Sequence, residues 1–336
     1  MNGMENKKPI LTISIPTYNR PQEIQKQVRL ILPQLNEEVI LIVYDNCSEH
    51  NVADLFTEEE KKLFQIKRNS LNIGGDANIA RCFEKCETDW LWTLSDDDYV
   101  KPNSIDKILE YIKNNKDCIF INFWSYQEGK TLNFKEFAQR MSNRGMFTAA
   151  FAMSTCLYNW KLLKYDIQYY YKYLSAMLGT LIMVSKNIER TNNKCFFIYD
   201  CFVELGSDVG WNYRDYIYSS SLFLEAFRKG RNPNVNYNNT LLSGYHKTNY
   251  KLIEINRKSS NIKYWQRLSL WLKAVNIQGC LNALIYNPKE CFSALLYSLI
   301  NFDSITFNKI INKTIQQLPA PIFSCLKKIK KLITKK

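Results

Sequence analysis

The chain has 336 residues, of which 46% are hydrophobic and 23% are charged. This composition is that of a globular protein of about two domains, and it excludes a fibrous repeat or a wholly disordered chain. The net charge of +13 is uneven, because acidic residues outnumber basic ones in residues 1–120 and basic residues predominate beyond them. An acidic first third suggests cation binding, whereas the basic remainder suggests an anionic partner.

The first 123 residues alternate between apolar runs and helical patterns. Strands are expected over 10–15, 39–44, 64–68, 90–94 and 118–123, and helices over 22–32, 54–63, 76–86 and 103–114. Strands that are apolar on both faces and alternate with helices indicate a doubly wound, mainly parallel α/β sheet. Ligands bind such sheets at the carboxyl ends of the strands, so the loops after them are the place to look for a site.

The pattern loosens beyond residue 130. Residues 133–175 look helical and aromatic, 180–185 looks like a further strand, 230–250 is rich in Asn, Gly and Pro and reads as a loop or linker, and 261–317 is again helical. The N-terminus carries no secretory signal, and no apolar run approaches the ~18 residues that a spanning helix needs. A cytoplasmic protein, peripheral at the inner face of the cell membrane, is therefore expected.

Few residues are available as soft metal ligands. The ten cysteines are scattered without a C-x-x-C pair and are expected to be free, buried thiols. The two histidines, His50 and His246, lie outside any ligand-spaced cluster, so a zinc site is not expected. A metal would be held by carboxylates, which favours Mg²⁺ or Mn²⁺.

Polar loops follow the first three strands. The first strand ends in Pro16, Thr17, Tyr18, Asn19 and Arg20, whose ring and polar groups suit a nucleotide, although an ordinary turn with Thr17 or Asn19 as helix cap is the alternative. Asp45 ends the second strand, either as a ligand of a base N–H or in an Asx-turn. After the third strand, Gly74 and Gly75 let backbone N–H groups approach a phosphate or ribose, in a stretch that also holds Arg68, Asn72 and Asn78.

The fourth strand runs into Ser95 and three adjacent aspartates, Asp96, Asp97 and Asp98. Three adjacent carboxylates repel one another and need a cation or strong hydrogen-bond donors. Behind an apolar strand they can bind a divalent ion that bridges a substrate diphosphate. The alternative is a solvated acidic turn before the next helix.

These loops occur in one order, as ISIPTYNR, IVYDNCS, RNSLNIGGDANIARCFE and WLWTLSDDDYVKPNSI. In that order they resemble the family 2 glycosyltransferases of the GT-A fold, firmly over residues 10–115 and loosely over 116–215. Length and spacing look most like O-antigen and capsule sugar transferases of the abequosyltransferase type. We therefore expect a catalytic domain over 1–230, followed by a helical region over 231–318 and a basic tail over 319–336.

The resemblance also implies residue roles. Residues 16–20 would line the nucleoside pocket, Asp45 would contact the base, and Arg68, Asn72, Gly74 and Asn78 would shape the floor. Asp96 would contact ribose, and Asp97 would be the principal metal ligand, with Asp98 as a second ligand or as the partner of Asp96 in another register. The family inverts the anomeric centre and needs a base. Asp208 is the first candidate, followed by Glu204 and Asp200.

The final segment predicts a membrane-facing helix. Residues 321–336 place apolar side chains along one helical face and six lysines on the rest. Such a helix suits an anionic membrane surface and a lipid-linked glycan acceptor, while a solvated tail is the alternative. Nucleic acid is not expected as a partner, because no recognised module is present. A sugar nucleotidyltransferase and a non-catalytic nucleotide-sugar-binding protein at the membrane surface remain the rival functions.

Overall fold

The computed structural model describes residues 8–206, 221–228, 235–255, 264–279, 282–284 and 287–299. The central sheet of this part of the chain has eight strands: β1 (Leu11–Thr17), β2 (Val39–Asp45), β3 (Gln65–Arg68), β4 (Trp90–Thr93), β6 (Cys118–Asn122), β7 (Trp124–Thr131), β8 (Cys156–Asn159) and β9 (Lys194–Tyr199). A small antiparallel pair, β5 (Tyr99–Val100) and β10 (Val203–Glu204), lies apart from it.

The strand order is β3-β2-β1-β4-β8-β6-β9-β7. β1 pairs in parallel with β2 and β4, and β2 pairs in parallel with β3. β8 and β7 run against their neighbours, whereas β6 and β9 are parallel to each other. The predicted mainly parallel α/β sheet is thus confirmed, with two reversed strands in its second half.

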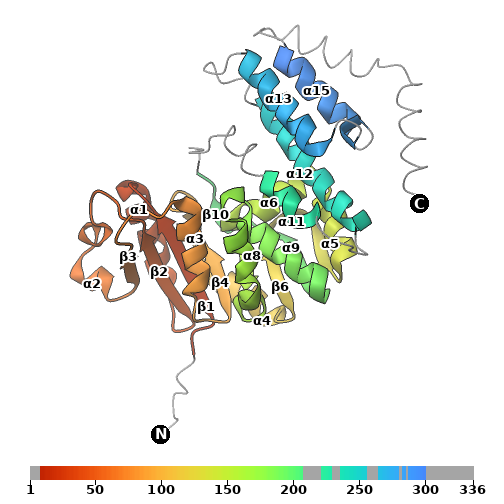
Figure 1. Cartoon of the computed structure of the whole chain (residues 1–336). Coiled ribbons are helices and arrows are strands. Elements are labelled where there is room, and N and C mark those ends of the chain that lie inside the picture. The colour runs from red at the N-terminus through yellow and green to blue at the C-terminus, as the bar shows by residue number, and fades with distance from the viewer. Residues whose placement is uncertain are drawn as a thin grey trace.

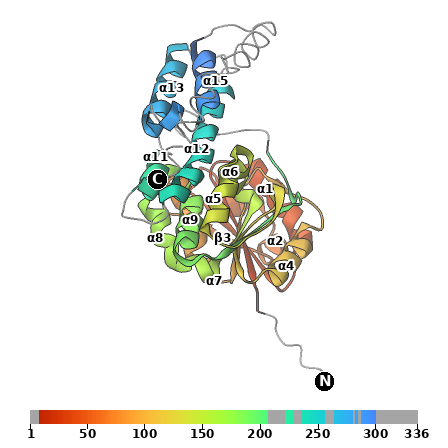
Figure 2. The ribbon, with the colours of Figure 1, turned by 90° about the vertical axis from the view of Figure 1, so that its right-hand side faces the viewer.

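Helices cover both faces of the sheet (Figures 1 and 2). On one face, α1 (Pro21–Ile31) and α4 (Ser104–Asn114) bury apolar side chains against the strands. The opposite face is covered by α3 (Gly75–Glu84), α5 (Phe134–Met141), α6 (Arg144–Phe151), α7 (Trp160–Leu163), α8 (Ile167–Lys172) and α9 (Gly179–Thr191). Both faces are therefore covered, which explains why β2 is a continuous apolar run and why even Thr12 and Ser14 of β1 are buried. The short α2 (Glu58–Lys61) carries a complete capping box from Thr57 and Glu60.

The strand predicted over 180–185 is wrong, because these residues lie inside helix α9. Residues 179–185 are all buried, so this stretch is apolar on every side. A short, continuous apolar run has no periodicity that separates a buried strand from a buried helix.

The loop predicted over 230–250 is also wrong in its larger part. Helix α12 (Val235–Ile255) occupies it and packs on α5 and α6. A Cβ at Gly244 would lie 1.8 Å from the carbonyl oxygen of Met141, so this glycine serves close packing of two helices rather than a linker. His246, expected in a loop, lies in α12 with 7% of its surface exposed.

The described parts of the C-terminal region are mostly helical, as predicted. Figure 1 shows α12 leading from the sheet toward α13 (Tyr264–Gln278) and α15 (Pro288–Leu299), while α11 (Ser221–Arg228) packs beside it. Within the described ranges, no helix combines the length and apolar character needed to cross a bilayer. The eight cysteines of those ranges are all free thiols, and six of them are buried.

Candidate active site

The carboxyl ends of β1, β2 and β4 meet at one edge of the sheet. Thr17 and Asp45 are paired residues at the ends of β1 and β2, and the Leu94 amide after β4 donates to the Ser14 carbonyl of β1 at 3.0 Å. The parallel register therefore brings the loop of residues 95–98, called the aspartate loop below, beside the loop that follows β1.

Asp96 faces the loop after β1 and is 5% exposed. The Thr17 hydroxyl donates to its Oδ2 at 2.7 Å, and Arg20 Nη1 donates to its Oδ1 at 3.0 Å. The same Arg20 nitrogen lies 2.8 Å from Asp97 Oδ2. Burial raises the pKa of Asp96 to about 6, against the opposing effect of Thr17 and Arg20. Arg20 thus compensates two of the three adjacent carboxylates.

Gln27 of α1 is buried, and its side chain hydrogen-bonds to the backbone of the aspartate loop. Its Nε2 donates to the carbonyl oxygens of Ser95, at 3.2 Å, and of Asp98, while its Oε1 accepts from the Val100 amide at 3.1 Å. Sequence reasoning missed Gln27, although a glutamine on the apolar stripe of Ile24, Val28 and Ile31 is a usable signal.

Two further residues fix the aspartate loop from distant parts of the chain. The Ser154 hydroxyl accepts from the Ser95 amide at 2.9 Å, and the Gly206 amide donates to Asp98 Oδ1 at 2.9 Å. Ser95 itself donates its hydroxyl to Asp97 Oδ1 at 2.5 Å. Ser154 and Gly206 carry no motif of their own, so sequence reasoning had no signal for them.

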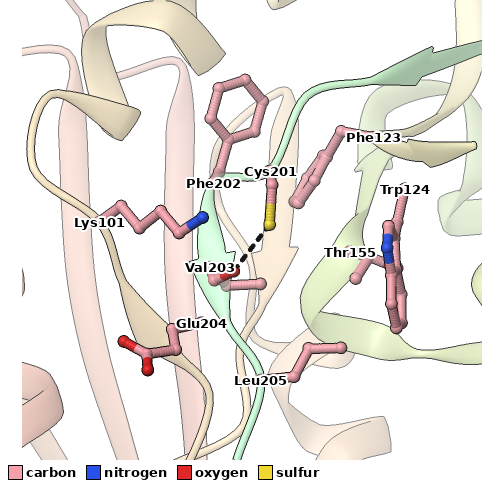
Figure 3. A pocket seen from close by; sticks show the side chains of 9 residues that line it. All are labelled: Lys101, Phe123, Trp124, Thr155, Cys201, Phe202, Val203, Glu204 and Leu205. Atoms are coloured by element: carbon pink, nitrogen blue, oxygen red, sulfur yellow. Dashed lines mark hydrogen bonds between the residues drawn. The ribbon is translucent and has the colours of Figure 1, made fainter.

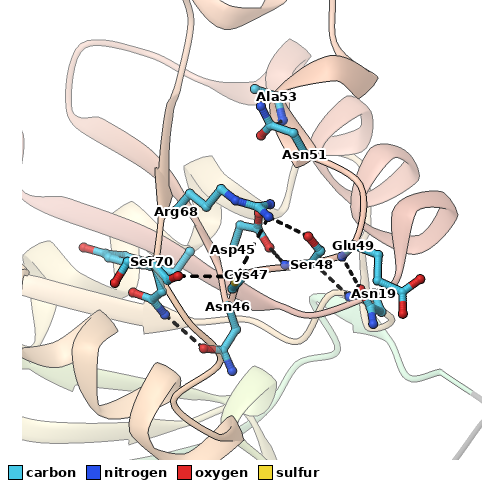
Figure 4. Close-up of polar contacts among 12 residues, drawn as sticks. Asn19, Asp45, Asn46, Cys47, Ser48, Glu49, Asn51, Ala53, Arg68 and Ser70 are labelled. Atoms are coloured by element: carbon cyan, nitrogen blue, oxygen red, sulfur yellow. Dashed lines mark hydrogen bonds and ion pairs between the residues drawn. The ribbon is translucent and has the colours of Figure 1, made fainter.

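Asp45 is fully buried, and both its oxygens are engaged (Figure 4). The Ser48 amide donates to Oδ1 at 2.9 Å, and the Arg68 guanidinium pairs with Oδ2 and donates to the Ser48 carbonyl at 2.6 Å. Ser48 also accepts from the Asn19 amide at 2.9 Å, while Asn19 Oδ1 accepts from the Glu49 amide at 2.8 Å. The loops after β1, β2 and β3 are therefore tied into one unit, in which Asp45 anchors Arg68.

An asparagine network forms the floor beside this unit. Asn46 Nδ2 donates to Asn72 Oδ1 at 2.8 Å, and the same oxygen accepts from the Gly74 amide at 2.9 Å. Asn69 Nδ2 lies 3.0 Å from the side-chain oxygens of both Asn46 and Asn78. The predicted floor residues Asn72, Gly74 and Asn78 thus come together with Arg68 at one sheet edge.

The residues of the loop after β1 differ in how deeply they are buried. Thr17 is buried at Asp96, Pro16 is half-buried in β1, and Tyr18 exposes 43% of its surface. The alternative in which Thr17 or Asn19 caps α1 is wrong, because Arg20 occupies the N-cap and no side chain caps the helix. The Tyr18 ring is accessible to a stacking base.

A cavity of about 500 Å³, called the Asp76 cavity below, lies on the other side of the aspartate loop. Its walls come from the start of α3, the aspartate loop, the end of α6 and the start of α9, and its lining includes Asp76, Ser95, Asp98, Phe151, Met153 and Thr180. Burial alone raises the pKa of Asp76 to about 6. Sequence reasoning did not single out Asp76.

A second cavity, of about 290 Å³, lies beside β10 (Figure 3). Phe123, Trp124 and Phe202 form its aromatic lining, and Lys101 and Glu204 supply its charged groups. Glu204, a predicted base, is exposed at this cavity, and the adjacent Gly206 reaches the aspartate loop. The first predicted base, Asp208, lies outside the described residues. The third, Asp200, is half-buried directly after β9, where its amide donates to the Phe123 carbonyl at 3.1 Å.

The carboxylates of the aspartate loop suit a hard cation only if a bound substrate supplies further oxygen ligands. In the described part of the chain, no three His, Cys, Asp or Glu side chains gather as a metal site. Both oxygens of Asp96 accept hydrogen bonds, from Thr17 and Arg20, and so do both oxygens of Asp97, from Arg20 and Ser95. A carboxylate has about four lone-pair sites, and the Asp97 side chain is more exposed than that of Asp96, 20% against 7%, so Asp97 and Asp98 can still offer oxygen to a cation. Mg²⁺ is commonly bound by one or two carboxylates with substrate phosphates, so this donor set fits an ion that arrives with a diphosphate.

Known proteins resemble the chain in sequence. It is 28% identical over 136 residues to the putative teichuronic acid biosynthesis glycosyltransferase TuaG of Bacillus subtilis, a match covering 39% of this chain and 53% of TuaG. It is 24% identical over 113 residues to the abequosyltransferase RfbV of Salmonella typhimurium, covering 32% of this chain and 34% of RfbV. The matched part thus spans about half or less of these relatives.

Solved structures share the fold. The S. aureus TarS 1–349 crystal structure superposes with a TM-score of 0.57 at 14% identity, covering 85% of this chain and 83% of that one. A TarS structure in complex with UDP gives a TM-score of 0.56 at 15% identity, over the same shares. Residues 12–173 match the family described as glycosyl transferase family 2. This part of the chain is therefore a family 2 glycosyltransferase domain, and it has the GT-A fold.

Proposed function

We propose that the protein is a glycosyltransferase that moves a sugar from a nucleoside diphosphate to a lipid-linked glycan. The observation that carries this proposal is the position of the aspartate loop. Asp96 of this loop meets Thr17 and Arg20 on one side, and Ser95 and Asp98 line the Asp76 cavity on the other. A nucleotide and the sugar attached to it can thus lie on the two sides of one acidic loop.

The donor nucleotide belongs at the loops after β1, β2 and β3. Tyr18 offers an exposed ring for a base, and the unit of Asn19, Asp45 and Arg68 lies beside it. Because both Asp45 oxygens are engaged, we expect Arg68 to present its outer face to the nucleotide while Asp45 fixes its position. TarS, which shares the fold, has been crystallised with UDP and with UDP-GlcNAc, which supports a nucleotide-sugar donor here.

Asp97 and Asp98 would hold Mg²⁺ or Mn²⁺ together with the diphosphate. The ion, when bound, offsets negative charge on the leaving diphosphate. Arg20, already 2.8 Å from Asp97 Oδ2, keeps this carboxylate in place while the donor arrives. Gln27 and Ser154 keep the loop backbone fixed, so little reorganisation is needed.

The proposed reaction is a displacement at the anomeric carbon with inversion. The acceptor hydroxyl oxygen forms a bond to that carbon, the carbon–oxygen bond to the diphosphate breaks, and its electron pair leaves with the phosphate oxygen. The hydroxyl proton goes to a carboxylate base. Glu204 lies at the second cavity, whose Trp124 and Phe202 offer apolar surface to an acceptor. Asp208 and Asp200 remain the other candidates.

The acceptor would be an O-antigen or capsule oligosaccharide on a lipid, by an abequosyltransferase-like reaction. The match to RfbV supports this choice, and so does the basic tail over 321–336, which lies outside the described residues. Deleting 321–336 should abolish co-sedimentation with anionic vesicles but leave turnover of a soluble acceptor unchanged. Equal sedimentation of both proteins would contradict a membrane role for the tail.

The donor proposal is tested by thermal shift with UDP, CDP, GDP and dTDP, each with Mn²⁺ or with chelator. We expect one nucleotide to stabilise the protein only with Mn²⁺, and Asp97→Ala to lose this effect. Asp89→Asn is the matched control, because Asp89 precedes β4 at the end opposite to the aspartate loop. Donor binding by Asp97→Ala that equals wild type, with metal and with chelator, would overturn the metal role.

Two rival functions give different products. A sugar nucleotidyltransferase would release pyrophosphate from a nucleoside triphosphate, whereas a glycosyltransferase releases a nucleoside diphosphate. A non-catalytic binding protein would release neither, even with donor, metal and acceptor present. Product analysis by phosphorus NMR therefore separates all three.

A further inference from the structure

The Asp76 side chain is half-buried and lines the Asp76 cavity. No hydrogen-bond donor or cationic side chain in the described part of the chain reaches it, and its raised pKa has burial as its only cause. Asp45, Asp96 and Asp166 are more deeply buried than Asp76, and each of these three carboxylates accepts two or more hydrogen bonds. A half-buried carboxylate that has no donor from the protein has lost part of its hydration without compensation, so a donor supplied by a ligand would stabilise it.

The surroundings of Asp76 define the chemistry of that ligand. An ionised carboxylate only accepts hydrogen bonds, so the ligand must bring hydroxyl or amine donors. Ile79, Phe151 and Met153 supply apolar wall to the same cavity, which suits the C–H face of a ring. A pyranose combines both surfaces, with hydroxyls at its edge and C–H groups on its faces.

The cavity also has the right size and position. Its volume of about 500 Å³ falls within the range of small-molecule sites, which is about 300–1,000 Å³. Ser95 and Asp98 line it directly, so it begins where the diphosphate of a bound donor would end. Thr180, at the start of α9, adds a hydroxyl to the far wall.

We propose that Asp76 is a specificity residue for the transferred sugar, accepting hydrogen bonds from its ring hydroxyls inside the Asp76 cavity. This inference rests on the proposed function, because it assumes that a nucleotide sugar binds at the aspartate loop. It assigns no proton transfer to Asp76, which positions the sugar ring and selects it by its hydroxyl pattern.

The test measures binding of a nucleoside diphosphate and of its hexose conjugates separately. Isothermal titration with Mn²⁺ first identifies which of UDP, CDP, GDP and dTDP binds the wild-type protein, and then ranks commercially available sugars on that nucleotide. For the best conjugate, Asp76→Ala should lower the affinity at least tenfold, while the affinity for the free diphosphate stays within twofold. The affinity of Asp76→Asn for the conjugate should lie between those of the wild-type protein and Asp76→Ala, because asparagine keeps one acceptor oxygen.

A matched control and a hydroxyl-specific readout separate recognition from a structural effect. Asp106→Asn alters an exposed aspartate in the first turn of α4, as Asp76 lies in the first turn of α3, and should change neither affinity. Conjugates lacking one hydroxyl should bind the wild-type protein more weakly at the recognised position, and this difference should vanish in Asp76→Ala.

The possible failures are distinguishable. If the wild-type protein binds none of the four diphosphates, the proposed function falls and this inference falls with it. If the diphosphate binds and Asp76→Ala retains wild-type affinity for the conjugate, the donor proposal stands and the role of Asp76 is refuted. A loss of affinity for the free diphosphate as well would place Asp76 at the nucleotide and would also refute it.

Discussion

Gly206 lies directly against the backbone of Asp97. A Cβ on Gly206 would come within 2.7 Å of the Asp97 carbonyl oxygen, closer than real Cβ contacts allow, while the Gly206 amide donates to Asp98 Oδ1. The segment that follows β10 is therefore in contact with the aspartate loop, although 108 residues separate the two ends of this hydrogen bond.

Gly206→Ala should displace the aspartate loop and weaken Mn²⁺-dependent nucleotide binding by about tenfold or more, since catalytic and binding sites tolerate displacements of only about 0.5 Å. Gly145→Ala is the control, because its Cβ would meet nothing nearer than 3.4 Å. Titration calorimetry of both variants measures the effect. Unchanged binding by Gly206→Ala would mean that the segment after β10 yields without moving the aspartates.

Replacing Arg68 by Met should leave the Asp45 carboxylate buried without its cationic partner. Breaking such a pair by removing one partner costs about 3–5 kcal/mol, so we expect the free energy of unfolding to fall by about 3 kcal/mol or more. Urea unfolding measures it. Arg29→Met removes an exposed pair with Glu60 and should have a far smaller effect. If the two variants lose the same stability, Asp45 is not held mainly by Arg68.

A double variant tests the pair of Asp45 and Arg68 in a second way. Because Asp45→Asn removes the buried charge, the double variant Asp45→Asn with Arg68→Met should recover part of the stability that Arg68→Met alone loses. Additive losses would show that the two side chains act independently.

Gln27→Leu should destabilise the protein although leucine suits the apolar stripe of α1. It removes the partner of two loop carbonyls and of the Val100 amide, and each unsatisfied buried group costs about 1–3 kcal/mol. A loss of at least about 2 kcal/mol in the free energy of unfolding is expected. Gln22→Leu, at an exposed position of the same helix, should stay near zero. A neutral or stabilising Gln27→Leu would contradict the anchoring role.

The first four sheet strands and the polar loops behind them could be predicted because their signals are local. β2 and β4 are apolar runs and β1 is rich in β-branched residues, whereas the short β3 has one apolar residue. Parallel pairing then brings Thr17, Asp45 and Asp96 to one edge. The contacts that hold the aspartate loop are not local. Ser154 and Gly206 meet it across 59 and 108 residues, and neither carries a motif. Only the folded chain shows which serine or glycine meets which loop.

The wrong predictions also arise because contacts between distant parts of the chain leave no local signal in the sequence. Residues 180–185 lie in the part of α9 that is buried on every side, so this stretch lacks the polar face that identifies a helix in sequence. Gly244 signalled a linker, yet it allows α12 to approach the Met141 carbonyl. Asp76 was overlooked because one aspartate in a first turn is the commonest kind of helix start, and only the cavity around it sets it apart.

Asp76 should make stability depend on pH. Burial raises its pKa from 3.8 to about 6 in the folded chain, so the folded protein keeps this proton at pH values where the unfolded chain has lost it. Stability from this group is therefore greatest below pH 4 and is lost as the pH rises through 6. A difference of about two units between the folded and unfolded pKa corresponds to about 3 kcal/mol. The free energy of unfolding of Asp76→Asn should therefore exceed that of wild type by up to about 3 kcal/mol at pH 7.5, and by little at pH 4. Urea unfolding of both proteins across this range checks the prediction, and because Asp96 and Asp98 titrate in both, only the difference between them reports on Asp76. Two parallel curves would show that the Asp76 carboxylate is not withdrawn from water.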